Sequence, residues 1–248
     1  LWKFSSQVLE HHQITLPRSW IGRIFLAPSF LADWNLDVFF AMATAFIILA
    51  CLFRPHYITT VLYFLLTLNL YVIYLPFASG ADIVTFMLAL WFIPVATRPS
   101  FRSELGQIIQ RTLFNIGTLL CRIQVVFIYF ISGADKLQSS SWRSGDAFDY
   151  ITHLKAMFNP EFDGFFDNPT LAFILSWAVI IFELSFVVLV WFERTRLTIL
   201  SIGIIFHLFI WIVMSLPDFA GIMMISFLIF LSDSDVRRFR KAIKLSPL

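Results

Sequence analysis

Residues 131–150, ISGADKLQSSSWRSGDAFDY, mark the point where a long apolar segment ends and the largest polar segment of the chain begins. Lys136 lies at this boundary, two residues after the largely apolar run 127–134 ends. A lysine placed there borders both lipid and water, and its proton affinity is easily lowered in such surroundings. Two interpretations are open. Lys136 is a base covered by a lid that contains Trp142, or its amine simply reaches the membrane surface beside an interfacial tryptophan.

The composition indicates a membrane protein. Hydrophobic residues make up 59% of the 248-residue chain and charged residues 14%, and the mean hydropathy is +0.81, whereas a soluble domain is about 25% charged. Phenylalanine occurs 30 times, which suits surfaces that face lipid or pack between helices. We therefore expect an all-α fold, a polytopic transmembrane helix bundle that forms one domain.

Seven apolar segments follow one another along the chain, at residues 36–53, 57–77, 83–96, 113–134, 171–192, 197–216 and 219–231. Most approach the roughly 20 residues that a helix needs to cross a bilayer. Short connections between them predict antiparallel neighbours. The expected organisation is an extramembrane or interfacial segment at 1–35, a transmembrane domain at 36–232 with a polar loop at 135–168, and a basic tail at 233–248.

The distribution of positive charge predicts the orientation in the membrane. If all seven segments cross, eleven Lys and Arg residues fall on the side of the C-terminal tail and six on the side of loop 135–168, with Arg122 inside a segment. Positive residues concentrate on the cytoplasmic side. The tail is therefore expected in the cytoplasm, the loop on the other side, and the protein in a bacterial inner membrane.

Other classes of ligand find little support. No basic cluster is interleaved with aromatic residues, which argues against nucleic acid as a partner. His11 and His12 are adjacent but have no third ligand nearby, so no metal site is predicted. Cys51 and Cys121 both lie in apolar segments and are expected to be packed thiols.

Three ionisable residues lie inside apolar segments, namely Arg122, Glu183 and His207. An unpaired charge in lipid is costly, so each needs a partner or a function. Glu183 and His207 lie about halfway along neighbouring antiparallel segments, which predicts a hydrogen bond between them, direct or through one water. Such a pair is either a proton relay or a polar clamp between two helices, and the spacing supports both.

Arg122, Tyr129 and Lys136 are spaced by seven residues, close to the roughly 7.2 residues of two helical turns, so they share one helix face. Arg122 and Lys136 would lie about 21 Å apart along the axis. Tyr129 is either a packing aromatic or a hydrogen-bond donor to a polar ligand head. Asp82 is expected on the same membrane face as Lys136 and is a candidate counter-ion. Such a pair would keep the lysine charged and oppose its role as a base.

Residues 133–137, GADKL, with Trp142 and Gly145 after them, resemble the signature of HTTM-domain proteins. These proteins are similar to the membrane part of vitamin K-dependent gamma-carboxylase. Three further stretches fit in order and spacing: GAD at 80–82, Glu183 within its segment, and FHL at 206–208 followed by Phe219. The resemblance covers most of residues 54–232, and it implies a helix ahead of the first segment.

The resemblance also implies a chemistry. In the carboxylase, a lysine at the position of Lys136 is the base that deprotonates reduced vitamin K, and the product formed with oxygen removes a γ-proton from glutamate, which takes up carbon dioxide. Carried over to this chain, the resemblance implies a reduced, vitamin K-like quinone as cofactor. The predicted site comprises catalytic Lys136, Glu183 and His207 and quinone-binding Asp82, Arg122, Tyr129 and Trp142, of which Arg122 and Tyr129 are included for their place on the helix face of Lys136.

Two departures from the family pattern narrow the expected activity. The carboxylase has a functional histidine near the start of the helix that matches 83–96, where this chain has Ala81 and Asp82. It also has a large extramembrane domain for its peptide substrate, and this sequence ends at Leu248. Quinone chemistry is therefore expected rather than glutamyl carboxylation. The alternative, from another functional class, is a non-catalytic subunit or assembly factor that binds membrane lipid and other membrane protein chains.

Overall fold

The computed structural model describes residues 57–73, 79–96, 103–153, 158–162 and 164–242. Within these ranges every regular element is helical and no strand occurs, as the composition predicts. The α-helices are α5 (Tyr57–Ile73), α6 (Gly80–Ala96), α7 (Glu104–Gln138), α8 (Ser140–Ser144), α9 (Ala147–Thr152), α10 (Pro169–Leu189), α11 (Glu193–Val213), α12 (Pro217–Ser226) and α13 (Asp233–Ala242). The 3-10 helices are η2 (Pro160–Phe162) and η3 (Phe227–Phe230). The expected first segments, 1–35 and 36–53, lie outside the described residues.

Three of these helices are long and apolar enough to cross a membrane, namely α7, α10 and α11. Shorter apolar helices accompany them at Gly80–Ala96 and Pro217–Phe230. The outward faces carry exposed aliphatic side chains, such as Ile181 at 59% and Ile205 at 67% exposure, which lipid accommodates and water does not. The chain is thus an integral membrane protein, while the number of seven crossings stays a prediction.

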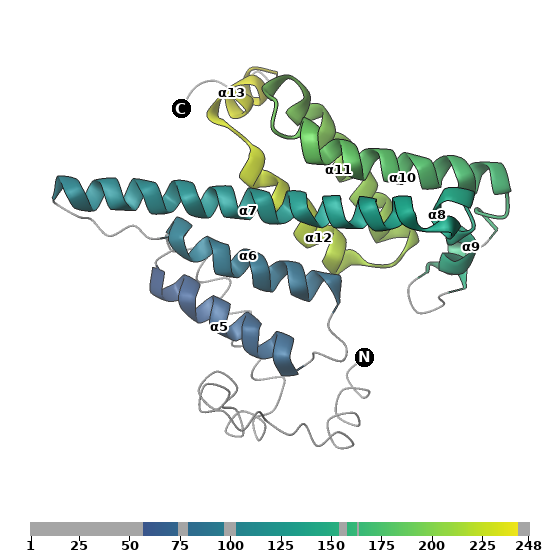
Figure 1. Cartoon of the computed structure of the whole chain (residues 1–248), viewed down its shortest axis with the longest axis horizontal. Coiled ribbons are helices and arrows are strands. Elements are labelled where there is room, and N and C mark those ends of the chain that lie inside the picture. Colours follow the sequence, from purple (N-terminus) through teal and green to yellow (C-terminus); the bar gives the residue numbers. More distant parts are fainter. Residues whose placement is uncertain (1–56, 74–78, 97–102, 154–157, 163, 243–248) are drawn as a thin grey trace.

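The helices are arranged so that each contacts the next around a ring. α5 packs on α6, α6 on α7, α7 on α10, α10 on α11, α11 on α12, and α12 returns to α6. In Figure 1, α7 runs between the α5–α6 pair on one side and the α10–α11 pair on the other. The buried core inside the ring consists of Val84, Val125, Tyr129, Phe182, Phe186, Val190, Ile199, Leu200, Met223, Phe227 and Phe230.

The central helix α7 begins earlier and ends later than the apolar segment 113–134. Ser103 caps its first turn, because its Oγ accepts a hydrogen bond from the backbone N–H of Gly106. Its 35 residues give a length of about 52 Å, and its first turns extend beyond the other helices in Figure 1. One buried stripe recurs every four residues and holds the helix against its neighbours: Gly117, Cys121, Val125, Tyr129 and Gly133.

The polar loop packs against one end of the bundle. Its aromatic side chains Phe148, Phe158 and Phe166 are buried together with Val213 at the end of α11. Asn159 caps that end, since its backbone N–H donates to Val213 O at 2.9 Å and its Nδ2 to Ile212 O at 3.1 Å. Within the loop, α9 spans Ala147–Thr152, and residues 154–157 lie outside the described ranges.

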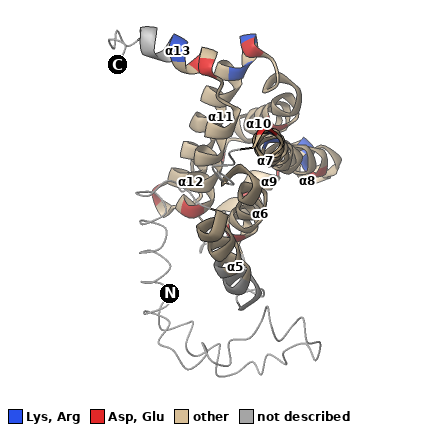
Figure 2. Cartoon of the chain, turned by 90° about the vertical axis from the view of Figure 1, so that its left-hand side faces the viewer, with Lys and Arg blue, Asp and Glu red and all other residues tan. Residues whose placement is uncertain are grey.

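The opposite end of the bundle carries α13 and the turn between α10 and α11. Figure 2 shows Lys, Arg, Asp and Glu residues gathered at α13. Because α10 runs antiparallel to α7 and α11, the bundle has two distinct ends. The loop, with α8 and α9, lies at one end, and α13 lies at the other.

Candidate functional site

A pocket of about 220 Å³ lies inside the ring, at the end that the loop covers. α7, α10, α11 and α12 form its walls, while Trp142 of α8 and Phe148 and Ile151 of α9 line it from the loop. Most lining side chains are apolar. The polar ones are Tyr129, Ser132, Lys136, Glu183 and His207. The pocket therefore offers a hydrophobic enclosure with a small number of polar groups, which is typical of ligand sites.

Lys136 and Glu183 form an ion pair in this pocket. Lys136 Nζ lies 3.0 Å from Glu183 Oε1, and the two side chains are 17% and 5% exposed. Ser132, one helical turn before Lys136, receives a hydrogen bond from the amine and donates one to Glu183 Oε1 at 3.1 Å. The amine also lies 5.0 Å from the centre of the Trp142 ring, a distance at which a cation is attracted to an aromatic face.

A second polar pair lies deeper along α7. The hydroxyl of Tyr129 and Nε2 of His207 are 2.7 Å apart, and both residues are buried. Tyr129 stacks on Phe186 with ring centres 4.1 Å apart, and Phe219 and Phe227 contact the His207 ring edge-on or tilted. These aromatic contacts hold both rings in place. Tyr129 is thus both a packing residue and a hydrogen-bonding one.

Glu183 and His207 form no direct hydrogen bond, so of the two expected arrangements only the bridge through one water remains a prediction. Each residue pairs with a different residue of α7. Glu183 pairs with Lys136, and His207 pairs with Tyr129, which lies seven residues before Lys136. Glu183 Oε2 and His207 Nδ1 remain buried without a hydrogen-bond partner among the described residues.

Asp82 is not the counter-ion of Lys136. Its Oδ2 accepts hydrogen bonds from Ser79 N at 2.7 Å and Ser79 Oγ at 2.8 Å. Ser79 and Asp82 thereby cap the start of α6, which is the preferred arrangement for Ser and Asp three residues apart at a helix N-terminus. Asp82 does not line the pocket.

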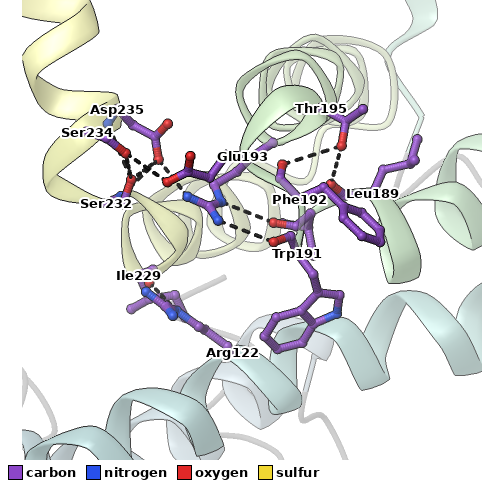
Figure 3. A network of polar contacts seen from close by, with 12 residues as sticks. Arg122, Leu189, Trp191, Phe192, Glu193, Thr195, Ile229, Ser232, Ser234 and Asp235 are labelled. Atoms are coloured by element: carbon purple, nitrogen blue, oxygen red, sulfur yellow. Dashed lines mark hydrogen bonds and ion pairs between the residues drawn. The ribbon is translucent and has the colours of Figure 1, made fainter.

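Arg122 also lies away from the pocket. Its Nε donates a hydrogen bond of 2.7 Å to the carbonyl oxygen of Ile229 in η3, as Figure 3 shows. This contact satisfies a carbonyl near the end of a short helix, where backbone acceptors lack partners. The three residues share one face of α7. Tyr129 and Lys136 on this face line the pocket, whereas Arg122 lies toward the other end of the bundle.

Two glycines in the region allow close packing around the site. A Cβ on Gly133 would lie 2.9 Å from Leu184 Cδ2 and 3.2 Å from Glu183 Cβ, so the absence of a side chain brings α10 against α7. Gly145 has φ +92° and ends α8, and a Cβ there would lie 2.8 Å from the backbone N of Phe173. Both glycines thus position groups that line the pocket.

Sequence reasoning missed Ser132. Its position four residues before Lys136 places the two side chains on one helix face, and this spacing could have identified it. The pairing of Lys136 with Glu183 had no comparable local signal, because 47 residues separate them.

The HTTM domain model matches residues 38–234 of the chain. The chain belongs to the HTTM-domain family. The HTTM domain is shared with vitamin K-dependent gamma-carboxylase. No similarity to a curated protein or to a solved structure is detected. Every residue that lines the pocket falls within the HTTM match.

The described part of this HTTM protein contains no group of three or more His, Cys, Asp or Glu residues that could hold a metal ion. Cys121 is a free, buried thiol, and Cys51, His11 and His12 lie outside the described residues. The polar groups that line the pocket can instead accept, donate and transfer protons.

Proposed function

We propose that this HTTM protein binds a quinone-like isoprenoid lipid in the pocket and that Lys136 acts as a base toward its reduced head group. One observation carries the proposal. A lysine amine lies in a mostly apolar pocket of a membrane helix bundle, together with two buried polar atoms, Glu183 Oε2 and His207 Nδ1, that lack partners among the described residues. Buried polar atoms are normally satisfied, so unpaired ones on residues that line a pocket favour a ligand or water nearby.

The size and lining of the pocket suit the head group of an amphiphile. Its volume of about 220 Å³ is below the roughly 300–1,000 Å³ of sites for drug-sized molecules. It therefore suits a single ring, with a long isoprenoid tail left to the surrounding lipid. Phe206, Phe219 and Trp142 supply aromatic walls. Glu183 and His207 offer hydrogen bonds to ring oxygens on the polar side.

The ion pair modifies the simplest form of this proposal. An ion pair with Glu183 at 3.0 Å requires Lys136 as an ammonium, and an ammonium is not a base. Transfer of one proton from Lys136 Nζ to Glu183, directly or through Ser132 Oγ, gives a neutral amine and a neutral acid without changing the net charge of the pocket. Burial of a neutral pair is less costly than burial of two ions. A reduced quinone, when bound, supplies a hydroxyl whose proton Lys136 Nζ can then accept.

The test uses the lipids that accompany the purified protein. Val179 lines the pocket, whereas Ile181 on the same helix is 59% exposed on the outer face. The quinone bound to wild-type protein, Val179→Phe and the control Ile181→Phe is extracted and quantified by mass spectrometry. We expect quinone with wild type and Ile181→Phe, and a loss of about tenfold with Val179→Phe. Equal amounts in all three proteins, or none in wild type, would contradict the proposal.

The alternative of a non-catalytic subunit is favoured by a different observation. The first turns of α7 expose Leu105, Ile108 and Ile109 at 68%, 55% and 47%. They also extend beyond the other described helices. Apolar groups on a projecting segment are suited to contact with another membrane protein chain. A protein that carries no quinone but purifies with a second chain would favour this function.

A further inference from the structure

A buried carboxylate at the other end of the bundle fixes α13 in place. Asp235 is 1% exposed, and its Oδ2 accepts hydrogen bonds from Ser232 N at 3.0 Å, Ser232 Oγ at 2.6 Å and Arg196 Nη1 at 2.8 Å. Figure 3 shows Ser232 and Asp235 at the start of α13. Burial alone would raise the pKa of Asp235. The hydrogen bonds from Ser232 and Arg196 outweigh burial and lower the pKa, so the carboxylate stays charged at neutral pH.

Arg196 joins this carboxylate to the turn between α10 and α11. Its Nε donates to Val190 O at 3.2 Å and its Nη2 to Trp191 O at 3.3 Å. Since α10 and α11 are both long enough to cross a membrane, the turn that connects them lies at a membrane surface. The contacts of Arg196 therefore hold α13 at that surface.

The surface around this turn combines positive charge with exposed aromatic rings. Arg194, Arg237 and Arg238 are exposed and have no hydrogen bond or ion pair among the described residues. Trp191 and Phe192, in the turn itself, are 40% and 57% exposed. Of the nearby acids, Glu193 accepts a hydrogen bond from Ser234 and Asp233 is exposed. Tryptophan beside arginine is typical of the lipid headgroup layer.

We propose that Arg194, Arg237 and Arg238, called here the arginine edge, bind the phosphate groups of anionic phospholipids. A guanidinium binds phosphate through two parallel N–H groups, and the neighbouring aromatic rings lie at the level where acyl chains meet headgroups. Arg196 and Arg122 are left out of the edge, because their guanidinium groups already donate to protein groups. The ligand is the headgroup of a bilayer lipid, since the edge is continuous with the transmembrane helices.

Native mass spectrometry of the full chain in detergent tests this surface. Phosphatidylglycerol and phosphatidylcholine are titrated separately, and the ratio of their affinities is compared between wild type and Arg237→Gln/Arg238→Gln. We expect preferential binding of phosphatidylglycerol to wild type. The affinity should fall about fivefold for each arginine removed, with phosphatidylcholine binding unchanged. The matched control is Arg143→Gln, an exposed arginine at the opposite end of the bundle.

A second variant separates the position of α13 from its charge. Asp235→Asn weakens the contact with Arg196 but leaves all three arginines of the edge in the chain. We expect a weaker preference for phosphatidylglycerol, because α13 is no longer held at the surface. If charge alone attracted the lipid, Asp235→Asn would prefer phosphatidylglycerol as strongly as wild type or more strongly. That result would show that the fixed position of α13 is not needed for binding. Equal binding of both lipids to wild type, or an equal loss in Arg143→Gln, would overturn the proposal as a whole.

Discussion

For Lys136, the location could be predicted from the sequence but the counter-ion could not. Its place at the end of an apolar helix, near Trp142, could be predicted because both features are local. Its counter-ion could not, since Glu183 approaches only when α7 and α10 pack together. Asp82 was the wrong candidate for a local reason. The pattern Ser-x-x-Asp at 79–82 is a helix cap, and a capping carboxylate is already occupied.

At the same scale, Lys136→Arg tests the proposed proton transfer. A guanidinium retains the charge needed to pair with Glu183, but it does not release its proton in a protein. We expect unfolding temperatures in detergent close to wild type. With reduced quinone as substrate and dissolved oxygen as oxidant, we expect a loss of about a hundredfold in the rate of quinone oxidation, followed by the absorbance of the quinone. Full turnover by Lys136→Arg would show that the amine is not a base and that its contact with Glu183 is structural.

At the scale of elements, apolar runs predicted helices well and their ends poorly. Each described apolar segment is a helix, because residues that must avoid water in lipid also satisfy their backbone groups within a helix. The ends depend on capping and tertiary contacts, so α7 begins at Glu104, nine residues before the apolar run at 113. The pairing of helices across the ring, such as α12 with α6, had no signal in the sequence.

The contact between α7 and α10 provides a prediction about an element. Gly133→Ala would place a methyl group 2.9 Å from Leu184 and 3.2 Å from Glu183. We expect the two helices to separate slightly and stability to fall by about 1–3 kcal/mol, the typical cost of an added methyl in a packed core. Gly221→Ala in α12 is the control, since no atom would lie within 4 Å of its Cβ. Thermal unfolding in detergent measures both variants, and equal tolerance would mean that Gly133 does not set the packing.

At the scale of the whole molecule, the two ends of the bundle can be distinguished by accessibility. The charge distribution predicts that loop 135–168 is outside the cytoplasm and α13 inside it. In a Cys51→Ser/Cys121→Ala background, we expect Ser140→Cys in intact cells to react with an impermeant maleimide. Asp233→Cys, exposed at the other end, should react only after permeabilisation. The reverse pattern would invert the orientation and move the pocket to the cytoplasmic half of the membrane.

α7 is longer than the membrane that it is suited to cross. The 21 residues of α10 and of α11 give about 32 Å each, which matches a hydrocarbon core of about 30 Å with little tilt. α7 is about 52 Å long, and its apolar run 113–134 accounts for about 33 Å of that length. The first turns of α7, which precede the apolar run and contain Glu104, Gln107 and Arg111, are therefore left to protrude from the hydrocarbon core. A change in bilayer thickness will strain the α10–α11 hairpin, while α7 can absorb it by exposing more or less of its first turns.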